Sequence, residues 1–88
     1  MSTLIVSLED IIASAKMVVN TARYVADRES LRAACVDDLS NIVESELYQD
    51  LDELNLDDYL PDEEVEEFYG EASDAAEREA WMVLGAYE

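Results

Sequence analysis

The chain has 88 residues, of which 23 are acidic and five are basic, so its formal net charge is −18. A chain of this length forms one domain, which we expect to span residues 1–88. It contains no histidine and a single cysteine, which excludes Ser-His and Cys-His catalytic pairs, internal disulfides and thiolate zinc sites. We therefore expect no enzyme activity, no metal and no cofactor. Five scattered basic residues cannot neutralise a nucleic-acid backbone, and an anionic membrane would repel the chain.

The apolar content is that of a folded domain. Half of the residues are hydrophobic, whereas a disordered acidic chain combines high charge with low hydrophobicity. Only two glycines and one proline interrupt the chain, which favours helices. We expect an all-α fold, a small three- to four-helix bundle. We see neither a signal peptide nor an apolar run of membrane-spanning length, and the single cysteine suits a reducing compartment, so we expect a cytoplasmic protein, in the host cell if a phage encodes it.

The first helix is expected to begin after Ser7, whose side chain can cap it, and to run to Ala26. Glu9 and Asp10 suit the positive end of the helix dipole. Apolar residues then recur at steps of three and four, which is typical of an amphipathic helix. The preceding residues, Thr3 to Val6, are either extended or an added turn.

The second helix is expected to be capped by Asp27 or Ser30. Its apolar positions follow a helical spacing: Leu31, Ala34, Cys35, Leu39, Ile42, Val43 and Leu47. In this pattern Cys35 is a small buried hydrophobic residue. A kink or a restart is expected near Gln49.

The third helical segment follows a connection at Asn55–Leu60, with Pro61 as its first residue. Its apolar stripe is Val65, Phe68, Tyr69, Ala72, Ala76, Ala80, Val83 and Leu84. Gly70 and Ser73 leave open whether this is one helix or two, and Gly85 suits its end. We expect Trp81 in the core, with a homodimer contact as the alternative.

The negative charge is confined to one part of the chain. Residues 1–36 sum to zero, whereas residues 37–67 hold fourteen acids and no base. If mostly helical, that stretch would extend roughly 46 Å with a charge about every 3.3 Å, close to the spacing along one DNA strand. A solvated face is the ordinary interpretation of such a run, but fourteen unpaired like charges cost stability, which favours a binding surface. The partner-binding acids are expected to be Asp37, Glu44, Asp52, Glu53, Asp57, Asp58, Asp62, Glu63, Glu64, Glu66 and Glu67.

Two other features of the acidic stretch bear on its chemistry. Asp50–Asn55 superficially suggests a calcium loop, but Leu54 and Asn55 stand where an EF-hand needs an oxygen ligand and a glycine. Tyr48, Tyr59 and Tyr69 alternate with the acids, and tyrosine is common at binding surfaces, although some of these rings can instead cap the core.

A family resemblance lies in residues 20–51, about a third of the chain. Its residues are Asn20–Arg28, the pattern Leu31, Ala34, Asp37 and Ile42, and the tyrosine-bearing acidic segment Glu46–Leu51. In this composition the chain resembles phage-encoded DNA mimics, such as the Ocr antirestriction family and acidic anti-CRISPR proteins. The resemblance implies an inhibitor that occupies the DNA-binding groove of a basic DNA-binding protein, such as a nuclease, a CRISPR effector or a polymerase.

Two other functions remain open from the residues themselves. A helical adaptor or antitoxin-like partner would dock the apolar end around Trp81 to Tyr87 into a groove and use its acids for solubility. An acidic chaperone for a basic protein would share the electrostatic mechanism of the DNA mimic but differ in its partner.

Overall fold

A computed structural model describes residues 7–85 of the chain, and these residues form helices and no strand. The elements are α1 (Leu8–Asn20), α2 (Ala22–Glu29), a 3₁₀ turn η1 (Ser30–Arg32), α3 (Val36–Glu53), a second 3₁₀ turn η2 (Leu56–Asp58) and α4 (Asp62–Leu84). The expected all-α bundle is confirmed. Thr3 to Val6 and Tyr87 lie outside the described residues.

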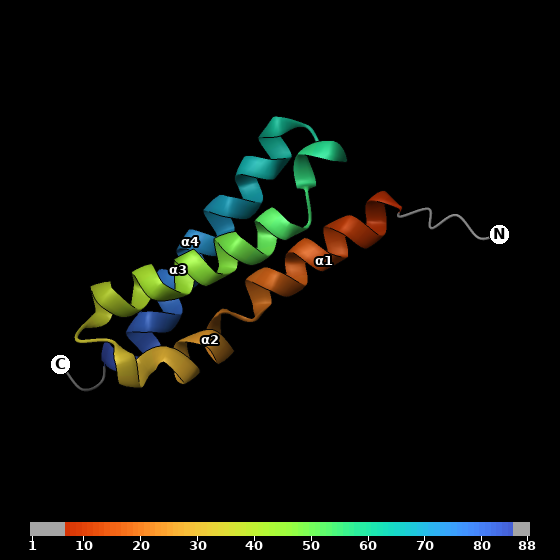
Figure 1. The fold of residues 1–88 in the computed structure, drawn as a ribbon. Coiled ribbons are helices and arrows are strands. Elements are labelled where there is room, and N and C mark those ends of the chain that lie inside the picture. Colours follow the sequence, from red (N-terminus) through yellow and green to blue (C-terminus); the bar gives the residue numbers. More distant parts are fainter. Residues whose placement is uncertain (1–6, 86–88) are drawn as a thin grey trace.

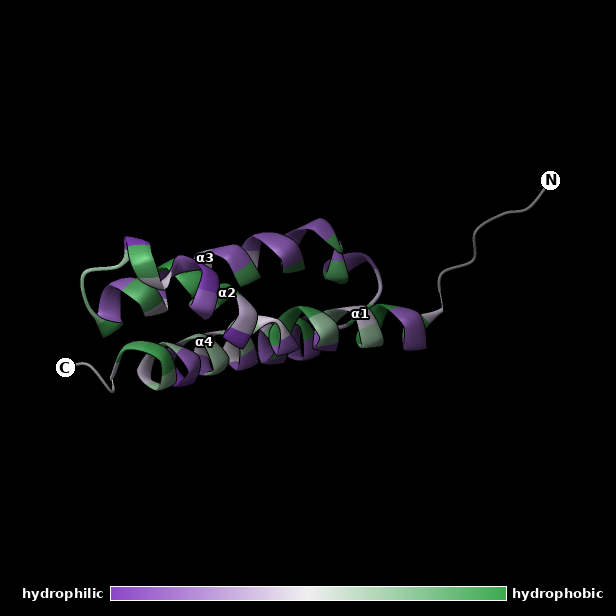
Figure 2. Cartoon of the chain, turned by 90° about the horizontal axis from the view of Figure 1, so that it is seen from below, coloured by the Kyte–Doolittle hydropathy of each residue, from purple (hydrophilic) through white to green (hydrophobic). Residues whose placement is uncertain are grey.

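The long helices α3 and α4 form an antiparallel pair, against which α1 and α2 pack (Figure 1). Seen from below, α2 and α3 form one layer and α1 and α4 the other (Figure 2). The core between them is built on a ladder of α3 side chains with no exposed surface: Leu39, Val43, Leu47 and Leu51. Alanines on α4, among them Ala72, Ala76 and Ala80, let the neighbouring helices approach closely.

The first predicted helix begins where expected but is divided in two. The Ser7 hydroxyl accepts a hydrogen bond from the backbone N–H of Asp10 at 3.1 Å, which confirms the N-cap. At Thr21 the hydroxyl donates to the carbonyl of Val18 at 2.7 Å, and the Thr21 backbone N–H donates to the same oxygen at 3.1 Å. Because this local bonding competes with the regular helical ladder, α1 stops at Asn20 and α2 starts at Ala22, with Thr21 between them.

The predicted start of the second helix is wrong. Ser30 begins a 3₁₀ turn, its hydroxyl donates to the carbonyl of Asp27 at 2.9 Å, and neither residue caps a helix that follows. The segment then extends, and Cys35 has φ −159° and ψ 175°. Because the turn and the extended segment break the helical periodicity, Leu31 is 96% exposed and Cys35 is exposed rather than buried.

The α3 helix begins at Val36, five residues later than the Leu31 start of the predicted pattern. The carboxylate of Asp38 accepts a hydrogen bond from the backbone N–H of Ala34 at 3.2 Å and so ties the preceding segment to the first turn. The helix then runs without interruption to Glu53, so the kink expected near Gln49 is absent.

The connection and the last helix follow the prediction closely. Pro61 occupies the N-cap position, one residue before the start of α4, and its carbonyl accepts from the N–H of Val65 at 3.1 Å. The helix passes through Gly70 and Ser73 as a single element and ends before Gly85. Trp81, however, is 57% exposed and is not a core residue, because the buried stripe of α4 ends at Ala80.

Candidate functional site

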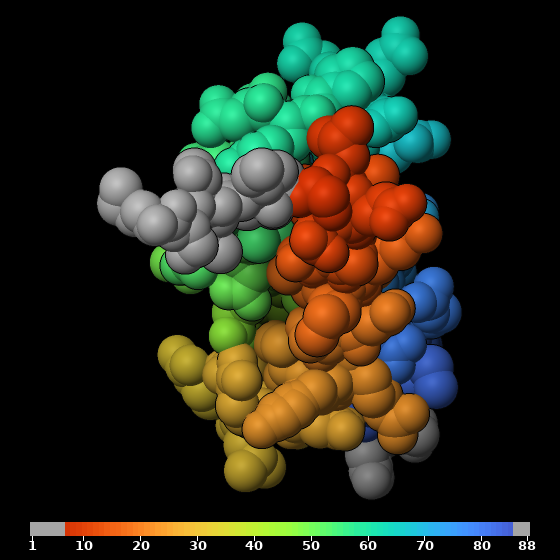
Figure 3. Space-filling model, turned by 90° about the vertical axis from the view of Figure 1, so that its right-hand side faces the viewer, coloured from red at the N-terminus to blue at the C-terminus, as the bar shows by residue number. Residues whose placement is uncertain are grey.

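Most of the expected binding acids lie together where α3 turns into α4. Nine of the eleven belong to the last turn of α3, to the connection or to the first two turns of α4, and all nine are exposed. With the neighbouring Asp50 they make a group of ten, here called the acidic corner: Asp50, Asp52, Glu53, Asp57, Asp58, Asp62, Glu63, Glu64, Glu66 and Glu67. In Figure 3 this connection, coloured green to teal, projects at one end of the molecule, and α2 and η1 occupy the other.

The two remaining expected acids are not part of this corner. Asp37 lies in the first turn of α3, fifteen residues before Asp52, which corresponds to about 22 Å along the helix. Glu44 lies between them and is only partly exposed. The chain also reverses direction after α3, so no continuous acidic helix of 46 Å exists. The charge is a compact cluster at one end of the bundle rather than a ridge along its length.

Apolar anchors on both sides of the connection hold the corner. Asn55 adopts the left-handed conformation, with φ 53° and ψ 50°, which ends α3 and redirects the chain. Leu56 and Leu60 are buried and fasten the connection to the core, as does Val65 in the first turn of α4. Because these apolar residues point inward, the acids between them point into solvent.

No basic side chain neutralises the corner. The five ion pairs within residues 7–85 involve four acids, Asp27, Glu29, Glu46 and Glu79, and none of these is a corner residue. Arg28 and Arg32 hold the buried Glu29, with Arg32 Nη1 2.9 Å from its carboxylate. Four of the five basic residues are thus paired with acids outside the corner: Arg23, Arg28 and Arg32 in and around α2, and Arg78 in the second half of α4.

One side of the corner is fixed by a polar contact that the sequence did not reveal. The hydroxyl of Tyr69 donates to the carboxylate of Asp52, and the ring of Tyr69 meets the edge of Tyr48 with centroids 5.1 Å apart. The hydroxyl of Tyr48 in turn shares a hydrogen bond with Ser73. Burial and then the hydrogen bond to Asp52 raise the pKa of Tyr69 to about 12. These two tyrosines therefore join α3 to α4, whereas Tyr59, the third tyrosine of the acidic stretch, is exposed.

A small hollow of about 260 Å³ opens beside this contact. Its acidic lining consists of Asp52, Asp57 and Asp58, and Tyr69 forms part of its wall. Three carboxylates thus border one hollow, and an arginine guanidinium is a group that two carboxylate oxygens can hold at once.

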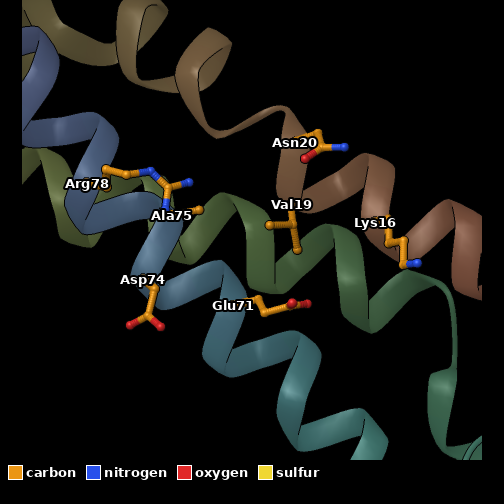
Figure 4. Close-up of a pocket in the computed structure, with 7 residues that line it drawn as sticks. All are labelled: Lys16, Val19, Asn20, Glu71, Asp74, Ala75 and Arg78. Carbon is orange, nitrogen blue, oxygen red and sulfur yellow. The ribbon is translucent and has the colours of Figure 1, made fainter.

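A second hollow, of about 350 Å³, lies between α1 and α4 (Figure 4). Lys16 and Asn20 border it from α1, and Glu71 and Arg78 border it from α4, whereas the carboxylate of Asp74 points away from α1. Charges of both signs line it, so it does not share the uniform negative charge of the corner.

Neither a metal site nor a membrane span is found in the described part of the chain. Residues 7–85 contain no group of three or more Asp, Glu, Cys or His side chains arranged to hold a metal ion. None of the helices among these residues combines the length and the apolar character that crossing a membrane requires.

Comparisons of the chain with protein families, with curated proteins and with solved structures find no match.

Proposed function

We propose that this chain is an inhibitor that presents the acidic corner in place of DNA to the basic groove of a DNA-binding protein, such as a nuclease, a CRISPR effector or a polymerase. The observation that carries the proposal is ten exposed acids at one end of the bundle with no ion pair among the described residues. A protein that needs charge only for solubility intersperses both signs over its surface. Here the acids face outward as one group.

The hollow at the corner supports a partner rich in arginine or lysine. Asp52, Asp57 and Asp58 surround a space large enough for one basic side chain, and the remaining corner acids surround it with further negative charge. A groove that binds DNA phosphates offers the complementary charge, because its basic side chains contact phosphate oxygens. We expect association to be fast and to weaken as salt increases.

Competition with duplex DNA tests this proposal. The immobilised chain is exposed to a bacterial lysate at low salt, the captured protein is identified, and its binding to the chain is measured with and without duplex DNA. We expect DNA to displace the chain. If the partner binds DNA and the chain at the same time without mutual effect, the proposal is wrong.

Two variants of equal net charge locate the binding surface. The corner variant carries Asp57→Asn, Asp58→Asn, Glu63→Gln and Glu64→Gln, and the control carries Glu9→Gln, Asp10→Asn, Glu71→Gln and Asp74→Asn. All eight positions are exposed, and each variant has a net charge of −18 + 4 = −14. We expect the corner variant to bind at least about tenfold more weakly and the control to bind nearly as the native chain does. Equal losses in the two variants would contradict a specific role for the corner.

The exposure of Trp81 and Met82, 57% and 55%, favours a helical adaptor as the second candidate function. Such an adaptor would dock the end of α4 into an apolar groove of its partner. Replacing both residues by Ala would then abolish capture of the partner, while the corner variant would leave capture intact. The opposite pair of results favours the DNA mimic.

A further inference from the structure

Two large apolar side chains are exposed on the outward face of α2 and in the turn that follows it. Leu31, just after the helix, is 96% exposed, and Tyr24 is 62% exposed. Arg23 and Asp27 lie on the same face, where their side chains are 60% and 59% exposed and 3.7 Å apart. The opposite side of α2, with Val25 and Ala26, is buried in the core. We call Arg23, Tyr24, Asp27, Arg28 and Leu31 the α2 face.

Two hollows flank the central Arg23–Asp27 pair of the α2 face. One, of about 650 Å³, is bordered by Tyr24 and Arg28. The other, of about 450 Å³, lies between Leu31 and Met82 at the end of α4. Both hollows include Arg23 and Asp27, so they adjoin along this pair. Exposed Tyr, Met and Arg side chains beside such hollows are typical of the centre of a protein interface.

The distribution of charge favours a second copy of the chain as the occupant of this surface. Copies of the chain repel one another at the acidic corner, where ten acids would meet ten acids. Residues 22–32 instead contain three arginines and two acids, a net charge of +1. An exposed pair of opposite charges one helical turn apart is self-complementary about a two-fold axis, because Arg23 of one copy then faces Asp27 of the other and the reverse.

The shape of the chain leaves surface for such a contact. Its radius of gyration is 14.6 Å, whereas a compact domain of this length has about 12 Å. Its smallest extent is only 15 Å, so the bundle is a thin slab. A second copy laid on the α2 face would cover the exposed Leu31 and Tyr24 and thicken the slab, while the two acidic corners would stay at distant ends.

We propose that the α2 face is the contact between two copies of this chain, which pair with their α2 helices antiparallel. This inference does not depend on the proposed function, because the acidic corner stays free in the pair. The two copies together carry twice the charge of one, so increasing salt should tighten their association. Salt should weaken the binding of the corner to a basic partner. The opposite effects of salt therefore distinguish the α2 face from the acidic corner.

Sedimentation over a range of concentration and salt tests the pairing. We expect the native chain to reach twice its monomer mass of 9.9 kDa, with a smaller dissociation constant at moderate salt than at low salt. Leu31→Glu should raise the dissociation constant about tenfold or more, because truncated or charged interface anchors cost more than 1.4 kcal/mol. The matched control is Met17→Glu, since Met17 is 68% exposed on α1 and lies outside the α2 face, and it should leave the pairing unchanged.

Charge exchange provides the second test. Arg23→Asp alone should weaken the pairing, and adding Asp27→Arg should restore it, because the exchanged pair is again self-complementary. Helical circular dichroism confirms that each variant is folded. A native chain that is monomeric throughout, a pairing that Met17→Glu weakens as much as Leu31→Glu, or a double exchange that restores nothing would each overturn the proposal. Those results would leave DNA competition at the corner unaffected.

Discussion

Two neutralising substitutions in the second turn of α4 should increase the free energy of unfolding. The number of like-charged pairs in the helix sets the expected size of the increase. Asp62, Glu63 and Glu64 occupy the first turn, where the helix dipole favours negative charge. Glu66 and Glu67 follow in the second turn and form four like-charged pairs with them at spacings of three and four residues. Each such pair destabilises a helix by about 0.2–0.5 kcal/mol, so Glu66→Gln with Glu67→Gln should add about 1–2 kcal/mol at low salt.

The matched control neutralises two acids in the first turn instead. Asp62→Asn with Glu63→Gln also gives a net charge of −18 + 2 = −16 and removes three of the four repulsive pairs. It loses two favourable dipole contacts of about 0.3–1 kcal/mol each, so its net effect should be near zero. The two double variants thus have the same charge but different predicted stabilities.

Thermal melts followed by circular dichroism measure the difference. A gain of 1 kcal/mol raises the melting temperature of a chain this short by about 4–8 °C, so the second-turn variant should melt roughly 4–16 °C above the native chain at low salt. High salt should reduce the gain through screening. If both double variants raise the melting temperature equally, total charge and not helix position controls the stability, and the reasoning is refuted.

The remaining predictions concern the two glycines of the chain and the tyrosine contact. Gly70→Ala should stabilise by about 0.5–1 kcal/mol in a denaturant titration, because Gly70 is within α4 and an added Cβ meets no atom within 4 Å; a loss of stability would contradict this. Gly85→Ala should shift the emission of the single tryptophan, because the new Cβ would lie 2.3 Å from the Trp81 ring, and an unchanged spectrum would show that the ring does not pack there. Asp52→Asn should lower the pKa of Tyr69 from about 12 in a phenolate absorbance titration, although burial keeps it above the ordinary tyrosine value of 10.0, and an unchanged pKa would rule out the contact. Because the folded chain holds this proton more tightly than the unfolded chain, the contribution of Tyr69 to stability is complete below pH 10.0 and falls as pH rises toward about 12.

The parts of the fold that the sequence predicted are those with strict apolar periodicity. Leu39, Val43 and Leu47 repeat every four residues, were expected on one apolar face and are fully buried. Leu51 continues the same buried ladder, although a kink near Gln49 was expected before it. The segment 30–35 was predicted to be helical because Leu31 and Cys35 have helical spacing. In the structure Leu31 lies in a 3₁₀ turn and Cys35 is extended, so neither belongs to a helix face. Apolar spacing is compatible with both a 3₁₀ turn and an α-helix. Which of the two forms depends on whether the backbone N–H groups bond to the carbonyl three or four residues earlier.

The acidic corner was predictable as a stretch of sequence but not as a shape. The lack of any base between residues 37 and 67 located the charge correctly on the chain. The reversal at Asn55 depends on a left-handed residue followed by two buried leucines, and only the fold shows that nine of the eleven expected acids lie together. The role of Tyr69 could be anticipated only as one of several alternatives, because its spacing suits both the core and the surface.

The acids of the corner are held on a folded domain and not on a flexible tail, which bears on their role. Acids that serve only solubility function equally well on an unstructured tail, where their mutual repulsion costs no folding free energy. Here Leu56, Leu60 and Val65 anchor the acids to the core, and Tyr69 holds Asp52 in place. Fixed charges lose little conformational entropy when they bind, whereas a flexible tail must be ordered at the moment of association. An anchored acidic surface that destabilises its own fold is therefore better suited to binding a basic partner than to keeping the protein in solution.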